Sequence, residues 1–350
     1  MNIKRKELLK SLETAMPFIS QFSYVDVLGC FCFSDKKLRA IGKGTEVILD
    51  FPYDLECCIP AELFFKLIQL LKEGDIELNV EGVSLIVEVK GSTQGKFKCF
   101  PMTDFPTYNP LKQEDGFKNL PDDFMPGLKR TMNTVCKDET RVDIGGVLVV
   151  KDIMYSTDKY RISQYKMKEG LEDSFFIPLD GVKCITSIDR KIEGYALDSN
   201  SLLLKIAGGY VRVKLGENKF PDVETYFSFD ADKLIRFPVG IKESIMRVAL
   251  IKDEDTIVEA DRIIRMVSDG KELRLDSVAG VPVTISDRLP IKDDGFPSFN
   301  VCINPVFLLE CLGSEKQAFK VLEDDLLIQF ADNGHKLSMA LSDVPVTPNE

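Results

Sequence analysis

The stretch IPAELFFKLIQLL, residues 59–71, predicts a helix that starts at its proline, and the same kind of start recurs twice along the chain. IPLDGVKCIT follows at residues 177–186 and INPVFLLECL at residues 303–312. Proline suits a first helical turn because the N–H it lacks would have no partner inside the helix. The prolines are separated by 118 residues (178 minus 60) and 127 residues (305 minus 178), each close to one third of the 350-residue chain. Three repeats are therefore expected.

A further helix is expected near the start of each repeat, over Lys4–Met16, Met125–Lys137 and Val239–Ile251. Apolar residues recur in each at three- or four-residue spacing, as at Leu8 and Leu12, so each helix offers one apolar face to a core. Alternating or β-branched runs between the helices predict strands. These runs are Val83–Val89, Gly146–Val150, Leu202–Ile206, Val211–Leu215, Thr256–Ala260, Ile263–Val267 and Leu326–Phe330.

Two helices and several antiparallel strands per repeat predict an α+β fold with helices on one face of a sheet. Boundaries are expected in the polar stretches Asn109–Leu120 and Ser228–Phe237, which follow Phe105-Pro106 and Phe220-Pro221. This division predicts domains at residues 1–118, 119–232 and 233–350.

The composition, with 44% hydrophobic and 29% charged residues, is that of a folded globular protein. Neither a signal-peptide core nor an apolar run of membrane-spanning length is present. The nine cysteines form no CxxC pair and there is one histidine, so reduced thiols, a cytoplasmic location, and no metal or cofactor are expected. The net charge of −11 argues against nucleic-acid contact over the whole surface, but it allows a basic patch.

Several segments, in order and at matching spacing, resemble the bacterial sliding clamp, the beta subunit of DNA polymerase III. They occur in all three repeats at a diverged level. They are Lys4–Leu9, Gly95–Lys98 before Phe105-Pro106, Lys137–Arg141 with Gly146–Leu148, Ser156–Ile162, Lys219–Asp222 and Phe299–Val301.

The resemblance implies a non-enzymatic processivity factor: three clamp domains per chain, two chains joined head to tail, and a ring around duplex DNA. A ring that slides needs lysine and arginine that hold the phosphate backbone without reading bases. Candidate DNA-facing residues are Lys4, Arg5, Lys10, Lys66, Lys129, Arg130, Lys183, Arg190, Lys191, Lys242 and Arg247.

The resemblance also implies a groove, between the second and third domains, for apolar peptides of polymerases and the clamp loader. An apolar lining with one arginine and one tyrosine at its rim suits such a peptide. Matching positions are Ile144, Thr157, Lys159, Tyr160, Arg161, Ile162, Phe227, Ser228, Met339, Ala340 and Leu341. Two stretches depart from the family pattern. Where the family has Asp-Gly-His-Arg, this chain has Asp158-Lys159-Tyr160-Arg161. Where the family has Met-Pro-Met-Arg-Leu near the C-terminus, this chain has Met339-Ala340-Leu341-Ser342.

Two other interpretations remain open. One is a clamp-fold interaction protein that does not encircle DNA. The other is a cysteine-dependent enzyme, because Cys57-Cys58 precedes a helix start that would lower a thiol pKa. His335 is the only imidazole base for such an enzyme, and no nucleophile-elbow, P-loop, dinucleotide-binding or zinc-protease motif is present.

Overall fold

The described residues form two compact units. A computed structural model describes residues 1–19, 26–106, 116–198, 200–217, 219–227, 235–251, 263–278, 284–292, 295–312, 318–322, 327–332 and 334–341. Unit 1 comprises Met1–Leu128, Gly146–Lys151 and Glu169–Asn218, and unit 2 comprises Lys129–Gly145, Asp152–Lys168 and Lys219–Glu350. The division into three domains predicted from the sequence stays a prediction.

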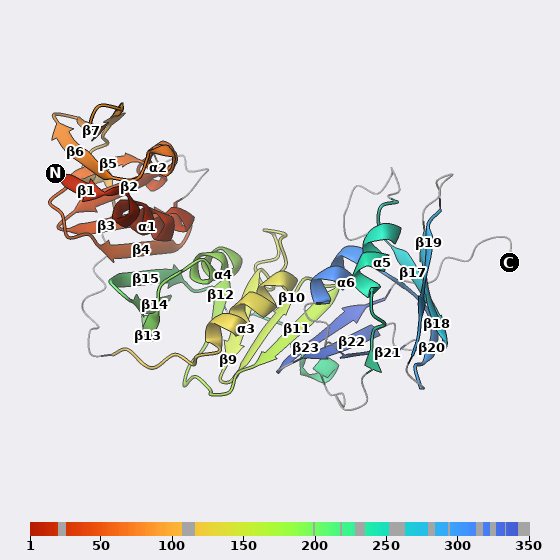
Figure 1. Ribbon diagram of the computed structural model, residues 1–350. Coiled ribbons are helices and arrows are strands. Elements are labelled where there is room, and N and C mark those ends of the chain that lie inside the picture. The colour runs from red at the N-terminus through yellow and green to blue at the C-terminus, as the bar shows by residue number, and fades with distance from the viewer. Residues whose placement is uncertain are drawn as a thin grey trace. The chain divides into compact units, whose positions relative to one another are not determined.

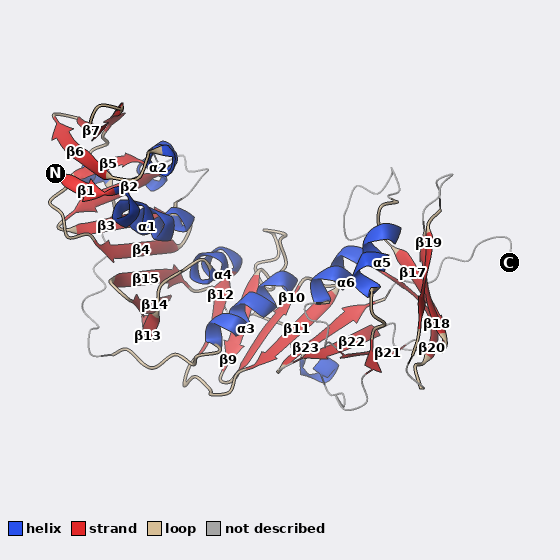
Figure 2. Ribbon diagram, viewed as in Figure 1, coloured by secondary structure: helices blue, strands red, loops and turns tan. Residues whose placement is uncertain are grey.

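All six predicted helices are confirmed (Figures 1 and 2). Pro60 and Pro178, however, are the N-cap residues of their helices and the last residues of the preceding strands, and only Pro305 lies in a first helical turn. The helices are α1 (Arg5–Ala15), α2 (Ala61–Leu70), α3 (Phe124–Thr131), α4 (Leu179–Thr186), α5 (Ile241–Val248) and α6 (Pro305–Cys311).

Helix α3 is shorter than predicted. The chain tightens into a 3-10 turn at Met132–Thr134 and becomes extended at Val135. The Thr134 hydroxyl donates to the Thr131 carbonyl at 3.0 Å, and the Ser156 hydroxyl donates to the same carbonyl at 2.7 Å. These hydroxyls satisfy a carbonyl that an extended helix would have used, so the helix ends there.

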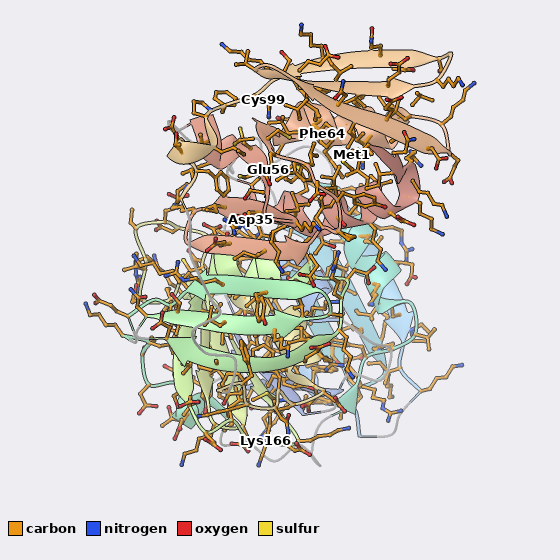
Figure 3. All side chains as sticks on the ribbon, turned by 90° about the vertical axis from the view of Figure 1, so that its left-hand side faces the viewer. Met1, Asp35, Glu56, Phe64, Cys99 and Lys166 are labelled. Carbon is orange, nitrogen blue, oxygen red and sulfur yellow. The ribbon has the colours of Figure 1, made fainter. Side chains whose placement is uncertain are left out.

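Unit 1 contains two antiparallel sheets and a strand pair. Helices α1 and α2 lie side by side in it (Figure 1). Phe64 of α2, labelled in Figure 3, is fully buried and packs edge to face on Phe33 and Phe97. One sheet has the order β1 (Asn2–Lys4), β6 (Asp75–Glu81), β7 (Ser84–Val89), β8 (Thr93–Lys98). The other has the order β13 (Ile192–Asp198), β14 (Ser201–Ile206), β15 (Gly209–Lys214), β4 (Thr45–Asp50), β3 (Lys37–Gly42), β2 (Cys30–Ser34), β5 (Cys57–Pro60). The pair is β12 (Ser174–Pro178) with β9 (Gly146–Val150).

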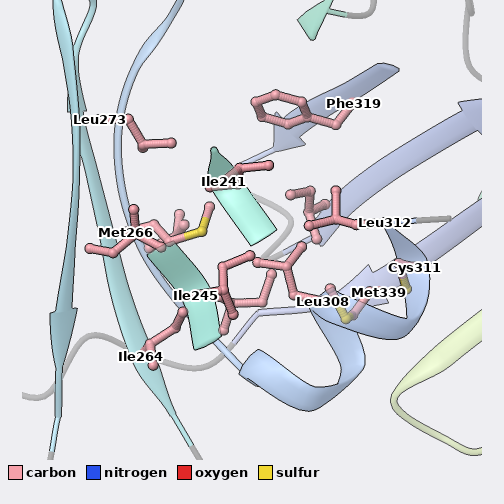
Figure 4. Packing of buried hydrophobic residues seen from close by; sticks show 14 of the residues in the cluster. Ile241, Ile245, Ile264, Met266, Leu273, Leu308, Cys311, Leu312, Phe319 and Met339 are labelled. Carbon is pink, nitrogen blue, oxygen red and sulfur yellow. The ribbon is translucent and has the colours of Figure 1, made fainter. Parts of the chain in front are cut away.

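Unit 2 contains two further antiparallel sheets, with α5 and α6 packed over an apolar core (Figure 4). Ile245 of α5, Leu308 of α6 and Phe319 of a strand are all fully buried in that core. One group of neighbouring strands is β10 (Ile153–Thr157), β11 (Arg161–Lys166), β23 (His335–Ala340), β22 (Leu327–Asp332), β21 (Ala318–Leu322), β16 (Ile235–Arg236). The other is β19 (Ser286–Pro290), β18 (Glu272–Ser277), β17 (Ile264–Asp269), β20 (Ser298–Ile303).

The strand predictions are confirmed, to within a few residues at their ends, by β7, β9, β14, β15, β17 and β22. The predicted strand Thr256–Ala260 lies outside the described residues. No helix among the described residues is long and apolar enough to cross a membrane.

Candidate peptide-binding surface and DNA-facing residues

The tight turn between β10 and β11 presents Tyr160 to solvent. The Asp158 carboxylate accepts hydrogen bonds from the backbone N–H of Tyr160 at 3.1 Å and of Arg161 at 2.8 Å. Aspartate favours such turns because its side chain bonds to the backbone two or three residues on. The Thr157 hydroxyl donates to the Arg161 carbonyl at 2.7 Å, which closes the turn. The Tyr160 side chain, 46% exposed, lies with its ring centroid 5.8 Å from that of Phe307.

Arg161 is buried, with 3% of its surface exposed, so its predicted place at an exposed rim is wrong. Its guanidinium donates to Asp158 Oδ2 at 2.7 Å, to the Asn133 carbonyl at 3.0 Å and to the Glu310 carboxylate. It also lies 4.1 Å from the centre of the Phe307 ring. Burial disfavours the charged form, but the attraction of Asp158 and the hydrogen bond to Glu310 outweigh it and raise the pKa of Arg161. Arg161 therefore fastens β11 to α6.

Strand pairing brings residues from two of the predicted groove segments next to each other. Strand β23 pairs with β11 so that Met339 lies opposite Arg161, and the Ala340 N–H donates to the Tyr160 carbonyl at 2.8 Å. Met339 and Leu341 belong to the buried core of unit 2, and Ile144 and Phe227 are buried too. Ser228 lies outside the described residues.

The exposed members of the predicted groove are Lys159, Tyr160 and Ala340, with Ile162 half-buried beside them. We call these four residues the rim surface. Phe307 and Glu310, which lie one helical turn apart on α6 and flank the Arg161 side chain, were not predicted from the sequence. The available signal was that both fall outside the predicted apolar stripe of Leu308, Cys311 and Leu312, although Phe307 also packs, partly buried, against the core of unit 2.

In unit 1, exposed lysines lie on three helices, with Lys10 on α1, Lys66 on α2 and Lys183 on α4. Lys4, the N-cap residue of α1, and Lys191, which directly precedes β13, are exposed too. Lys66 forms an ion pair with Glu62 one turn earlier at 2.6 Å.

Two arginines of unit 1 are instead bound within the fold. The Arg5 guanidinium, 14% exposed, donates to the Ile68 carbonyl at 2.9 Å and to the Gln69 carbonyl at 2.6 Å. It therefore caps the C-terminal end of α2, where cations are stabilising. The Arg190 side chain donates to the Ala207 carbonyl at 3.0 Å, and burial lowers its pKa. Both geometries favour a structural role.

In unit 2, Lys129 is exposed at the end of α3, and Arg130 beside it is half-buried. Lys242 on α5 is half-buried. Arg247 donates to the Asp287 carboxylate at 2.7 Å, and the Ser244 hydroxyl donates to the same oxygen at 2.9 Å. Arg247 is thus tied to β19, although half of its side chain stays exposed.

The thiols do not form an activated nucleophile at Cys57-Cys58. Burial is the largest of the effects that raise the pKa of Cys57, and hydrogen bonds with Cys30 and Cys32 raise that of Cys58. The suggestion that the helix start lowers a thiol pKa there is wrong, because both side chains are buried. His335 Nε2 lies 2.7 Å from the Ser163 hydroxyl, which is fully buried. Among the described residues, no cluster of three His, Cys, Asp or Glu side chains could hold a metal ion.

The chain is similar in sequence to beta sliding clamps, although no family model matches it. It is 24% identical over 309 residues to the beta sliding clamp of Rickettsia felis, covering 79% of each chain. It is also 24% identical over 210 residues to that of Chlamydia pneumoniae, an alignment that spans 57% of each chain.

Solved structures give the fold. The DNA polymerase III beta subunit of Thermotoga maritima superposes with a TM-score of 0.81 at 17% identity, covering 98% of this chain and 99% of that one. The sliding clamp of Bartonella birtlesii bound to griselimycin gives 0.81 at 19% identity, with the same coverage. The chain therefore has the fold of the DNA polymerase III beta subunit and is similar in sequence, at a diverged level, to beta sliding clamps.

Proposed function

We propose that the chain is a DNA sliding clamp, a processivity factor that encircles duplex DNA as a head-to-tail homodimer and tethers a polymerase. One observation carries the proposal: the likeness to beta subunits extends over 98% of the chain rather than over one repeat. The likeness thus covers the whole length over which three repeats are predicted, as a ring built from all of them would require. Its partners would be duplex DNA without sequence preference, a polymerase, a clamp loader and a second copy of itself.

The distribution of charge supports contact with DNA. Lys10, Lys66, Lys129 and Lys183 are exposed on four of the helices, in a chain whose net charge is −11. Helical lysines that hold phosphates loosely suit sliding, because contacts to the backbone carry no sequence information. Arg5 and Arg190, whose side chains bond to backbone carbonyls within the fold, would contribute little to this contact.

Homodimerisation is supported by two strands that lie at the edges of their sheets among the described residues. In unit 1, β8 is the last strand of its sheet, and in unit 2 β19 is an edge of its sheet. Exposed edges favour pairing with another chain, and head-to-tail pairing of two unlike edges can close a ring. We expect β8 of one chain to pair antiparallel with an edge strand in the third repeat of the other chain.

Sedimentation equilibrium tests the dimer. At micromolar concentration the expected mass is twice the 39.4 kDa of one chain, and electron micrographs of the same sample should contain rings with a central hole. A compact 39.4 kDa monomer at that concentration would contradict the proposal of a dimeric ring.

Peptide binding is proposed at the rim surface. Tyr160 is the large exposed side chain there, and aromatic side chains on a rigid support are common anchors for peptides. Tyr160→Ala should weaken a polymerase-derived apolar peptide roughly tenfold, or about 1.4 kcal/mol, measured by calorimetry or fluorescence anisotropy. Tyr226→Ala is the matched control, because Tyr226 is similarly exposed in the same unit. Unchanged affinity in Tyr160→Ala would place the peptide elsewhere.

The second candidate is a clamp-fold interaction protein that does not encircle DNA. The ion pairs of Lys66 with Glu62 and of Arg247 with Asp287 favour it, because they neutralise part of the candidate lining. Retention on circular DNA compared with linear DNA separates the two candidates.

A further inference from the structure

Two cysteines and an arginine form a row across three neighbouring strands of unit 1. Cys32 of β2 lies directly opposite Cys58 of β5 and, on its other side, directly opposite Arg39 of β3. Directly opposed residues point to the same face of a sheet, so the three side chains share one face. That face is covered by an apolar cluster that includes Val27 and Phe105.

The backbone spacing of this row suits a disulfide. Opposed Cα atoms in antiparallel strands are about 4.5 or 5.5 Å apart, inside the roughly 4.4–6.8 Å that disulfides span. Opposed Cβ atoms are about 4.5–5.5 Å apart, somewhat more than the roughly 3.5–4.5 Å of a relaxed disulfide. A bond formed here would be slightly strained and therefore readily reduced.

Other pairings fit less well. Cys30 lies opposite Pro60, two residues along from the Cys32–Cys58 position, and such diagonal neighbours are about 7–8 Å apart. Cys57 lies opposite Phe33 and points to the other face, because successive strand residues alternate. Although the Cys58 thiol contacts both Cys30 and Cys32, only Cys32 has the directly opposed backbone.

The row also distinguishes the two thiols chemically. Hydrogen bonding with Cys58, and then with Ser34, together with the charge of Arg39, lowers the pKa of Cys32 although burial opposes it. The pKa of Cys58 is raised instead, by hydrogen bonds with Cys30 and Cys32. The Nε of Arg39 is buried with no hydrogen-bond partner in the part of the chain that the structure describes. A cation beside one thiol of a pair favours its thiolate, the nucleophilic form.

We propose that Cys32 and Cys58 are a redox-active dithiol that small disulfides such as oxidised glutathione convert to a reversible intrachain disulfide. The Cys32 thiolate attacks one sulfur of the small disulfide, whose S–S bond breaks, and the leaving thiolate takes up a proton. The Cys58 thiol then loses its proton and attacks the Cys32 sulfur of the mixed disulfide, releasing the second small thiol. Two protein thiols are oxidised and one small disulfide is reduced to two thiols.

Burial of both thiols limits the rate of this reaction. Cys32 is 3% exposed and Cys58 is fully buried, so the oxidant enters when the covering cluster opens locally. Oxidation is expected to be slow but to proceed in the folded protein. The disulfide would tie β5 to β2, and β5 leads directly into α2.

The test uses the intact protein and oxidised glutathione without denaturant. After quenching with acid and blocking of free thiols, a non-reducing digest is analysed by mass spectrometry. The expected product is a linked peptide pair, lighter by two hydrogen atoms and separated by dithiothreitol. Trypsin leaves Cys30 and Cys32 on one peptide, because no lysine or arginine lies between residues 11 and 35, so variants must identify the bond.

Cys32→Ser and Cys58→Ser should each abolish the linkage, whereas Cys30→Ser, the matched control from the same face, should leave its rate within about twofold. Arg39→Gln should slow it several-fold and Arg39→Lys should restore it, because the charge favours the thiolate. Thermal melting identifies any variant that fails to fold. The proposal is overturned if Cys32→Ser still links at the original rate, or if the linkage forms only in denaturant.

Discussion

Replacing Arg161 by methionine is expected to lower the free energy of unfolding by about 3–5 kcal/mol, the range for removing one partner of a buried ion pair. Arg161 is 3% exposed, and its guanidinium joins Asp158, Glu310 and the Asn133 carbonyl. Methionine keeps much of the apolar stem but leaves those oxygens without their charged donor. Because the contacts tie β11 to α6, urea unfolding should shift to lower urea concentration.

A matched control is available in the same unit. Arg288 forms an exposed ion pair with Glu272 at 3.4 Å, with 64% of the Arg288 side chain accessible. Exposed pairs of this kind contribute about 0–1 kcal/mol, so Arg288→Met should leave the unfolding curve nearly unchanged. Equal losses in the two variants would show that the buried Arg161 network has no special role in stability.

Glu46 of β4 is expected to make the stability of the protein depend on pH. Glu46 lies opposite Arg212 of β15 and is 4% exposed, and its Oε1 has no hydrogen-bond partner among the described residues. Burial raises the pKa of the Glu46 carboxyl to about 7, against the opposing attraction of Arg212 and Arg39. The folded protein therefore prefers the protonated carboxyl.

The sign of the pH effect follows from proton uptake. Between the ordinary value of 4.5 and about 7, the folded state binds more protons at Glu46 than the unfolded state does. Stability from this group is fully present below pH 4.5 and is lost as the pH rises through about 7. Glu46→Gln removes the ionisation, so the stability difference between variant and wild type should widen by about 2–3 kcal/mol from pH 5 to pH 8.

Urea unfolding at several pH values measures that difference. Glu88→Gln is the matched control, because Glu88 lies on β7 of the same unit with its side chain exposed, and the same substitution there should leave the pH profile as it is in the wild type. A parallel profile for Glu46→Gln and wild type would contradict the account of Glu46.

The helices could be predicted because their signals are local. Apolar residues at helical spacing and a proline next to each second helix act within one or two turns, and all six predictions were confirmed. The end of α3 was not predicted because it depends on Ser156 of strand β10, whose hydroxyl donates to the Thr131 carbonyl. Local spacing contains no information about such a distant donor.

The sequence indicated which residues of the candidate site lie near one another better than it indicated their burial. The resemblance predicted that Arg161 and Met339 belong to one groove, and the register of β11 with β23 places them opposite each other. It could not predict that Arg161 is buried, because burial depends on Glu310 and Phe307 of a helix about 150 residues away in sequence. The thiol environments were likewise set by strand pairing, which directs Cys57 and Cys58 to opposite faces.

Encirclement of duplex DNA makes retention of the protein depend on the topology of the DNA. Protein is loaded on nicked circular DNA with its clamp loader and ATP, diluted, and followed before and after a restriction enzyme opens the circle. A closed ring is held by linkage rather than affinity, so we expect retention on the circle and rapid loss once the DNA is linear. Equal loss from circular and linear DNA would contradict encirclement.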